Sequence, residues 1–104
     1  MDAQLKKGVL EMCILYKLKD EPIYGYELMK SVRFVFPDVY EGTIYTILRR
    51  LNASEYTNFT IKESPSGPPR KYYGITETGK QYLEQMIMEW REMIGRVTNF
   101  GIPI

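Results

Sequence analysis

A long segment near the C-terminus, from about Glu77 to Thr98, constrains the fold of this chain more than any other feature. Its apolar residues recur at intervals of four and three, which predicts a helix with a heptad seam. The seam consists of Leu83, Ile87, Trp90, Ile94 and Val97, and a second apolar stripe beside it consists of Tyr82, Met86 and Met93. Such a helix must be covered on two sides, whereas 104 residues build only one small core. We therefore expect a partner chain to supply the second cover, with the seam as the dimer interface.

Helical spacing predicts three shorter helices before this segment, over about Leu5–Leu18, from Tyr24 or Gly25 to Phe34, and from Glu41 or Thr43 to Ala53. The predicted inward residues are Leu5, Val9, Met12, Cys13 and Tyr16 with a flank of Leu10, Ile14 and Leu18 in the first helix, Leu28, Met29 and Val32 in the second, and Ile44, Ile47, Leu48 and Leu51 in the third. Cys13 is thus predicted to be a small buried hydrophobe rather than a redox sensor.

Between the third helix and the last one the hydrophobic pattern changes to alternation, which is typical of strands. Phe59 and Ile61 alternate with polar residues, and a second alternating run covers Arg70 to Ile75. Residues 64–69 hold three prolines and are predicted to be a loop, because proline disrupts both helices and paired strands. We expect a β-hairpin with a long, stiff tip, followed by Thr76 as the N-cap of the last helix.

Three short helices, a two-stranded hairpin and a long helix form the element order of a winged helix-turn-helix. The predicted fold class is therefore mostly α with a small β-hairpin. Residues 1–76 would form the winged helix-turn-helix and residues 77–104 the dimerisation helix, in one compact unit. In this architecture the third helix is the recognition helix that enters the major groove of DNA, and the hairpin is the wing.

The composition argues against several other classes of protein. The chain has no histidine and one cysteine, so it lacks the commonest catalytic base and cannot form an internal disulfide or a cysteine-rich metal site. It has no phosphate-binding glycine loop of the required spacing and no paired carboxylates in an evident cleft. We therefore expect no enzyme activity, no cofactor and no metal. Because no apolar run reaches membrane length and no signal peptide is evident, the expected location is the cytoplasm.

The predicted recognition helix and wing carry a modest excess of positive charge. From Thr43 to Thr76 there are five basic and two acidic residues, a local charge of +3 against +1 for the whole chain. Exposed arginines are often only solvated charge, but Arg70 and Lys71 fall where a wing would contact DNA. Arginine and lysine would contact phosphates, while the hydroxyls of the recognition helix would read bases. The predicted DNA-binding residues are Tyr24, Thr43, Tyr45, Thr46, Arg49, Arg50, Lys62, Gly67, Arg70 and Lys71.

Four strings of the sequence occur in an order and spacing typical of one known family. They are Leu5–Glu11 (LKKGVLE), Tyr24–Leu28 (YGYEL), Gly42–Leu51 (GTIYTILRRL) and Gly67–Gly79 (GPPRKYYGITETG). Each string is weak alone, but the four together cover most of the predicted elements. Over nearly its whole length the chain resembles the PadR-type winged-helix transcriptional regulators.

The resemblance implies a bacterial or archaeal repressor that binds a pseudo-palindromic operator as a homodimer, paired largely through its last and first helices. Many members release DNA in response to a small aromatic molecule, and the single C-terminal helix resembles the subfamily without a helical effector domain. In some members a tryptophan in this helix stacks on planar ligands, so Trp90, with Met86 and Met93 one turn away, is a candidate effector site. The simpler interpretation is that Trp90 anchors the dimer core.

Two positions depart from the family's pattern. Glu55 stands where the family usually has glycine after the recognition helix. If a left-handed turn is kept there, it costs Glu55 about 1 kcal/mol, and otherwise Asn52 or Ser54 takes over the turn. Gly74 replaces a basic or larger residue and so removes one possible phosphate contact. The near-neutral charge and Glu55 leave a second hypothesis open, a winged helix that serves as a protein–protein interaction module without a specific DNA site.

Overall fold

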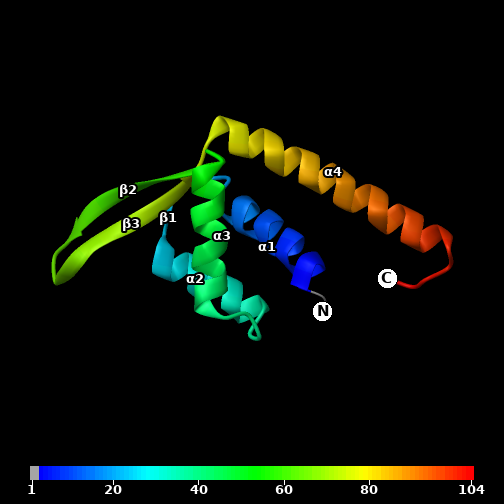
Figure 1. Cartoon of the computed structure of the whole chain (residues 1–104), viewed down its shortest axis with the longest axis horizontal. Coiled ribbons are helices and arrows are strands. Elements are labelled where there is room, and N and C mark those ends of the chain that lie inside the picture. Colours follow the sequence, from blue (N-terminus) through cyan, green and yellow to red (C-terminus); the bar gives the residue numbers. More distant parts are fainter. Residues whose placement is uncertain (1–2) are drawn as a thin grey trace.

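The structure, a computed structural model, describes the backbone of residues 3–104 and the side chains of residues 6–104. Its elements are α1 Ala3–Lys17, β1 Ile23–Tyr24, α2 Gly25–Val35, α3 Glu41–Ala53, β2 Thr57–Ser64, β3 Gly67–Ile75 and α4 Glu77–Asn99. Helices α1 to α3 and a small antiparallel sheet form a winged helix-turn-helix, from which α4 and the β2–β3 hairpin extend in different directions (Figure 1). The predicted fold class is confirmed. The prediction for the Leu5 side chain falls outside the described side chains.

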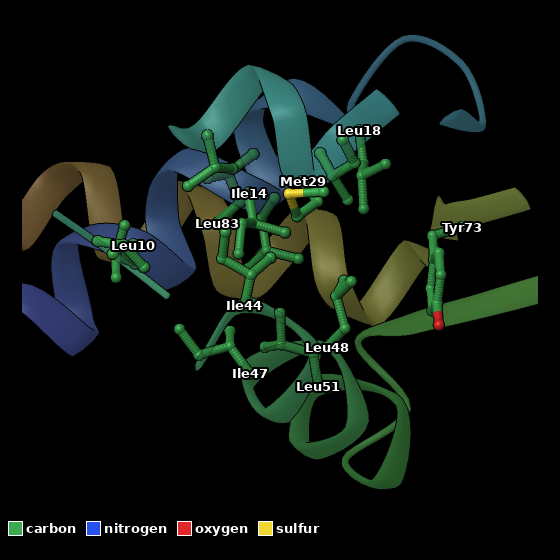
Figure 2. Packing of buried hydrophobic residues seen from close by; sticks show 14 residues of the cluster. Leu10, Ile14, Leu18, Met29, Ile44, Ile47, Leu48, Leu51, Tyr73 and Leu83 are labelled. Carbon is green, nitrogen blue, oxygen red and sulfur yellow. The ribbon is translucent and has the colours of Figure 1, made fainter. Parts of the chain in front are cut away.

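The core lies where α1, α2 and α3 meet, because each helix turns its apolar side inward. The buried residues of α2 and α3 include the predicted ones, namely Leu28, Met29, Val32, Ile44, Ile47, Leu48 and Leu51. Tyr73 of β3 and Leu83 of α4 belong to the same cluster (Figure 2). The core therefore fixes the wing and the start of α4 to the helical domain.

The buried face of α1 differs from the predicted one. Its most deeply buried residues are Leu10, Ile14 and Leu15, followed by Leu18 just after the helix. Met12 packs at the edge of the core but is only half-buried, as is Cys13, and Tyr16 is 55% exposed, because this side of α1 borders an open hollow beside α4. The prediction that Cys13 is a core residue is therefore wrong. Partial burial at the edge of the hollow raises the pKa of its thiol.

The sheet has three strands, one more than the sequence predicts, in the order β1-β3-β2. β1 is two residues long and pairs antiparallel with β3, with Ile23 opposite Tyr73 and Tyr24 opposite Tyr72. Two residues carry no periodicity, so the sequence alone gives no sign of this strand. By pairing with β3, β1 places the start of α2 directly against the sheet.

The prediction of a long hairpin tip is wrong. β3 begins at Gly67, which pairs with the end of β2, so residues 65 and 66 alone form the turn. Pro68 and Pro69 lie within β3, beside a shift in the register of the two strands. Proline is accepted at such an irregularity because the local ladder does not need its missing N–H. The wing is therefore a β-ribbon that keeps its strand pairing up to a tight turn.

The turn after α3 uses left-handed backbone at Glu55, with a φ of 62°. The N–H of Tyr56 donates to the carbonyl of Leu51 at 2.9 Å. The N–H of Glu55 donates to the carbonyl of Asn52 at 3.0 Å, which completes the Schellman pattern of helix ends. The Thr76 hydroxyl donates to the Glu55 carbonyl at 2.6 Å. The turn is thus kept at Glu55 and is tied to the residue that precedes α4.

Helix α4 begins against this turn. Thr76 is its N-cap, as predicted, and accepts a hydrogen bond from the N–H of Gly79 at 2.9 Å. A Cβ at Gly79 would lie 2.0 Å from the carbonyl oxygen of Tyr56, so glycine alone allows this close approach. Leu83, one turn later, is buried in the core.

Met86 and Ile87 still pack against the core, and the outer half of α4 then extends away from it (Figure 1). Trp90 is 39% exposed and Met93 is 55% exposed, although both belong to the predicted apolar stripes. The molecule is correspondingly elongated, with extents of 55 × 30 × 21 Å. None of the helices over residues 3–104 combines the length and hydrophobicity that crossing a bilayer requires.

Replacing Glu55 by glycine is expected to raise the free energy of unfolding by roughly 0.5–1 kcal/mol, because glycine adopts left-handed backbone without a Cβ clash. The matched control is Ser54→Gly, one residue earlier, where φ is −85°. There glycine only adds freedom to the unfolded chain and should lower stability. Urea unfolding followed by circular dichroism checks both variants. Effects of the same sign and size at the two positions would contradict the prediction.

Candidate nucleic-acid interface

The outward side of α3 carries the residues that a recognition helix needs. Gly42, Thr43, Thr46 and Arg49 are exposed on it, and Tyr45 is half-buried at its edge. The Thr46 hydroxyl donates to the Gly42 carbonyl at 2.8 Å, and Arg49 Nη2 donates to Thr46 Oγ1 at 3.1 Å. These hydrogen bonds hold the guanidinium of Arg49 along the helix surface, with donors left over for a ligand.

Two phenols border this surface. Tyr45 of α3 is partly buried, and this burial, with the nearby Glu41 carboxylate, raises the pKa of its phenol. Burial also raises the pKa of Tyr73 on β3, while the positive charge of Arg49 acts in the opposite direction. Both phenols therefore remain protonated at neutral pH and can donate hydrogen bonds.

Arg50, which the sequence predicts to be a DNA contact like Arg49, borders the same hollow as Thr46 and Arg49 but is turned toward α1, with 38% of its side chain exposed. Its guanidinium forms an ion pair with Glu11 of α1, and its Nε donates to Glu11 Oε1 at 3.1 Å. Adjacent residues of a helix point about 100° apart, so two neighbouring arginines cannot both lie at the centre of one side. The structure separates the pair into one exposed cation and one that contacts α1.

One face of the wing carries two cations, each over an aromatic ring. Lys62 Nζ lies 4.7 Å from the centre of the Tyr72 ring, and the guanidinium carbon of Arg70 lies 4.7 Å from the centre of the Tyr24 ring. In the strand register Lys62 is opposite Arg70 and Tyr24 is opposite Tyr72, so the four side chains share a face. Cation–π contacts of this kind restrain long side chains that would otherwise be mobile.

The opposite face of the wing carries Lys71. Its Nζ lies 4.6 Å from the centre of the Phe59 ring, and Ile61 is directly opposite Lys71 in the register. Phe59 and Ile61 are both exposed. The same face continues into Tyr73, which is buried in the core cluster together with residues of α3. This face of the wing therefore meets α3 at the base of the wing.

Sequence reasoning missed the aromatic partners Phe59 and Tyr72. The signal that could have found them is the strand register, which places each ring on the same face as its cation and two residues along the strands, but which requires both strands to be aligned. Gly67, a predicted DNA contact, lies exposed at the start of β3 beside the turn. Gly74, the other departure from the family's pattern, is buried, and a Cβ there would lie 3.1 Å from Asn58 Oδ1.

The predicted dimer seam divides into two parts. Leu83 is buried in the core of its own chain, and Ile87 is half-buried and packs against that core. Ile94 and Val97 are half-buried, and Trp90 is exposed. The part of the seam beyond Ile87 is therefore the part most open to a partner, and the interface stays a prediction.

A second candidate site lies between α1 and the outer half of α4. The predicted effector residues Met86, Trp90 and Met93 line one hollow there, together with Gly8, Val9, Met12 and Glu89. Trp90 also lines the neighbouring hollow, which includes Cys13 and Tyr16. The structure thus brings the three predicted effector residues together on one apolar surface.

Comparison with known proteins identifies the family. The model of the transcriptional regulator PadR-like family matches residues 14–85, which include α2, α3, the wing and the first turns of α4. The chain is also 31% identical over 90 residues to an uncharacterized protein of Lysinibacillus sphaericus, a match that covers 84% of this chain and 83% of the other.

Solved structures of regulators share the fold over almost their full length. A PadR-like transcriptional regulator from Bacillus cereus is 40% identical, with a TM-score of 0.83 over 98% of this chain and 100% of the other. A PadR-like transcription factor from Bacteroides fragilis is 35% identical, with a TM-score of 0.81 over 94% and 95%. A Streptococcus transcriptional regulator is 32% identical, with a TM-score of 0.85 over 97% and 100%. On these matches, the chain belongs to the PadR-like family of transcriptional regulators, whose members bind DNA.

Proposed function

We propose that this protein is a sequence-specific repressor that binds a pseudo-palindromic operator as a homodimer. The observation that carries the proposal is the outward side of α3, where Thr43, Thr46 and Arg49 are exposed, together with a wing that carries three cations over aromatic rings. A recognition helix with hydroxyl and guanidinium donors suits base edges, and a basic wing suits the phosphates beside it.

The proposed contacts follow from where each side chain lies. Thr43, Tyr45, Thr46 and Arg49 read the major groove, with Arg49 also within reach of phosphates. On the wing, the phosphate contacts are Lys62, Arg70 and Lys71, with Tyr24 beside Arg70 and with Gly67 allowing close approach of the backbone to DNA. We propose for Arg50 an indirect role, since Glu11 holds its guanidinium.

The homodimer would form through the outer half of α4. In the proposed organisation, residues 1–76 bind DNA and residues 77–104 dimerise, and buried Leu83 joins the two parts into one unit. The apolar residues beyond Leu83, chiefly Trp90 and Met93, need a cover that the described chain does not supply. A twofold pair places two recognition helices about 34–36 Å apart, one turn of DNA.

Loss of the Arg49 side chain is expected to weaken binding to the operator more than binding to a scrambled duplex. Arg49→Ala should weaken binding to the selected operator about ten- to a hundredfold and flatten the salt dependence by about one counterion. Lys80→Ala is the charge-matched control, since Lys80 is exposed on α4, with its Nζ 4.0 Å from the Glu77 carboxylate. Fluorescence anisotropy with an operator duplex enriched from a random-sequence library, and with a scrambled duplex, gives both affinities.

A wild-type preference of about a thousandfold or more that persists at physiological salt would establish specific regulation. Failure to enrich any palindrome, with equal and salt-sensitive binding to every duplex, would contradict the proposal. That result would favour the winged helix as a protein–protein interaction module.

The dimer is tested by a charge placed in the open part of the seam. Light scattering should give about 24 kDa for the wild type, twice the chain mass of 12.2 kDa. Ile94→Glu should give the monomer mass, because a carboxylate buried in an apolar interface is costly. Gln81→Glu adds the same charge at an exposed position of α4 and should remain dimeric. A wild-type monomer at micromolar concentration would contradict the proposed dimer.

The proposed effector site is a cavity for a small aromatic molecule beside Trp90, bordered by Met86 and Met93. Trp90 is the one tryptophan of the chain, so its emission reports on this site alone. The probe 8-anilinonaphthalene-1-sulfonate should quench that emission and weaken operator binding, and Met86→Ala, which shortens a side chain of the hollow outside the predicted seam, should reduce both effects. If the emission of Trp90 stays unchanged when the probe is titrated to saturation, the proposed effector site is contradicted. The simpler interpretation, that Trp90 anchors the dimer, then remains.

A further inference from the structure

Glu11 of α1 is a charged residue inside the helical core. It is 9% exposed, and it lies next to Leu10, which is almost fully buried. Among the side chains that the structure describes, it is the one buried group that carries a charge. A buried carboxylate is tolerated only when it is paired and hydrogen-bonded, so its partners deserve a functional explanation.

The partners of Glu11 come from two other helices. Arg50 of α3 donates to Oε1 through both Nε and Nη2, with the Nε bond at 3.1 Å. Tyr82 of α4 donates its phenolic hydrogen to Oε2 at 3.4 Å. One carboxylate therefore joins α1, the proposed recognition helix α3 and the proposed dimerisation helix α4.

The Tyr82 side of this cluster is held by packing as well. Its ring stacks on Tyr56, with 4.1 Å between centroids and 6° between planes. Tyr56 follows the turn that ends α3, and its carbonyl oxygen also fills the space where a Cβ of Gly79 would lie. Burial raises the pKa of the Tyr82 phenol, as does the neighbouring Glu11 carboxylate, so the hydroxyl keeps its proton for this bond.

From this geometry we infer that Glu11 is a positioning residue, which fixes the orientation of α3 relative to α4 through Arg50 and Tyr82. The inference rests on the proposed sequence-specific binding by a dimer. Two recognition helices match successive grooves only if each keeps a constant angle to its own dimerisation helix. Arg50 then acts on DNA through Glu11, and not by contact with a phosphate.

Glu11→Gln tests this role because it keeps the shape of the side chain and removes its charge. We expect operator affinity to fall about tenfold, while affinity for the scrambled duplex stays constant or rises about twofold, since the charge of Arg50 is no longer neutralised. A merely structural loss would weaken binding to both duplexes equally, through the unfolded fraction. Glu84→Gln, on the exposed side of α4, makes the same change in charge and should leave both affinities unchanged.

A double-mutant cycle with Arg50→Lys separates positioning from direct contact. Lysine keeps a positive charge for a phosphate but loses the two-point contact with Glu11. If Arg50 works through Glu11, Arg50→Lys should weaken operator binding about tenfold in the wild type and by less than about twofold in the Glu11→Gln background. Equal losses in the two backgrounds would show that Arg50 contacts DNA itself, and would overturn the inference.

Tyr82→Phe covers the case in which Glu11→Gln fails to fold, because it removes one hydroxyl and keeps the stack on Tyr56. Operator preference should fall about threefold, and an unchanged preference would overturn the link to α4. Circular dichroism and light scattering first establish that each variant is folded and has the wild-type mass. A wild type without operator preference would refute the proposed function and the inference together. A preference that Glu11→Gln retains in full would refute the inference alone.

Discussion

The packing of the first two turns of α4 against the turn that follows α3 is the contact on which the rest of the structure depends. It requires glycine at position 79, the hydrogen bond from Thr76 to the Glu55 carbonyl, and Leu83 in the core. β3 runs directly into α4 at Thr76, so this one contact fixes the base of the wing as well as the direction of α4 (Figure 1). The outer half of α4 must then project beyond the core, and its apolar residues remain exposed.

The sequence predicts the helices well because their periodicity extends over many residues. The inward faces of α2 and α3 and the N-cap at Thr76 depend on local spacing and local hydrogen bonds, and the structure has them as predicted. β1 could not be predicted, since two residues become a strand only when β3 pairs with them. The tight hairpin turn could not be predicted either, because the residues beside it argue against a strand. Pro68 and Pro69 normally exclude a strand, and a shift in register, which is a property of both strands, accommodates them.

The role of a candidate residue could be predicted where it depends on the exposed side of a helix. It could not be predicted where it depends on a contact with a residue far away in the sequence. Helical spacing places Arg49 and Arg50 close together, but Glu11, which is 39 positions from Arg50 in the chain, holds the guanidinium of Arg50, whereas Arg49 stays exposed. The signal was present in α1, where an acidic residue next to Leu10 on an apolar helix face indicates a buried partner. The same reasoning separates Leu83 from the outer seam, because the depth of the core determines where α4 stops contacting its own chain.

A net charge of +1 is compatible with the proposed DNA binding, because the arrangement of the cations matters more than their sum. In the wing, aromatic rings hold Lys62, Arg70 and Lys71 before any DNA is present. An ordered side chain loses less conformational entropy when it binds a phosphate, so a few such cations contribute as much as a larger number of mobile ones. The exposed hydroxyls of α3 add little charge, and in the proposed complex they distinguish bases. In the proposed complex, affinity and specificity therefore arise from different elements, and a fixed angle between α3 and the wing is required for both.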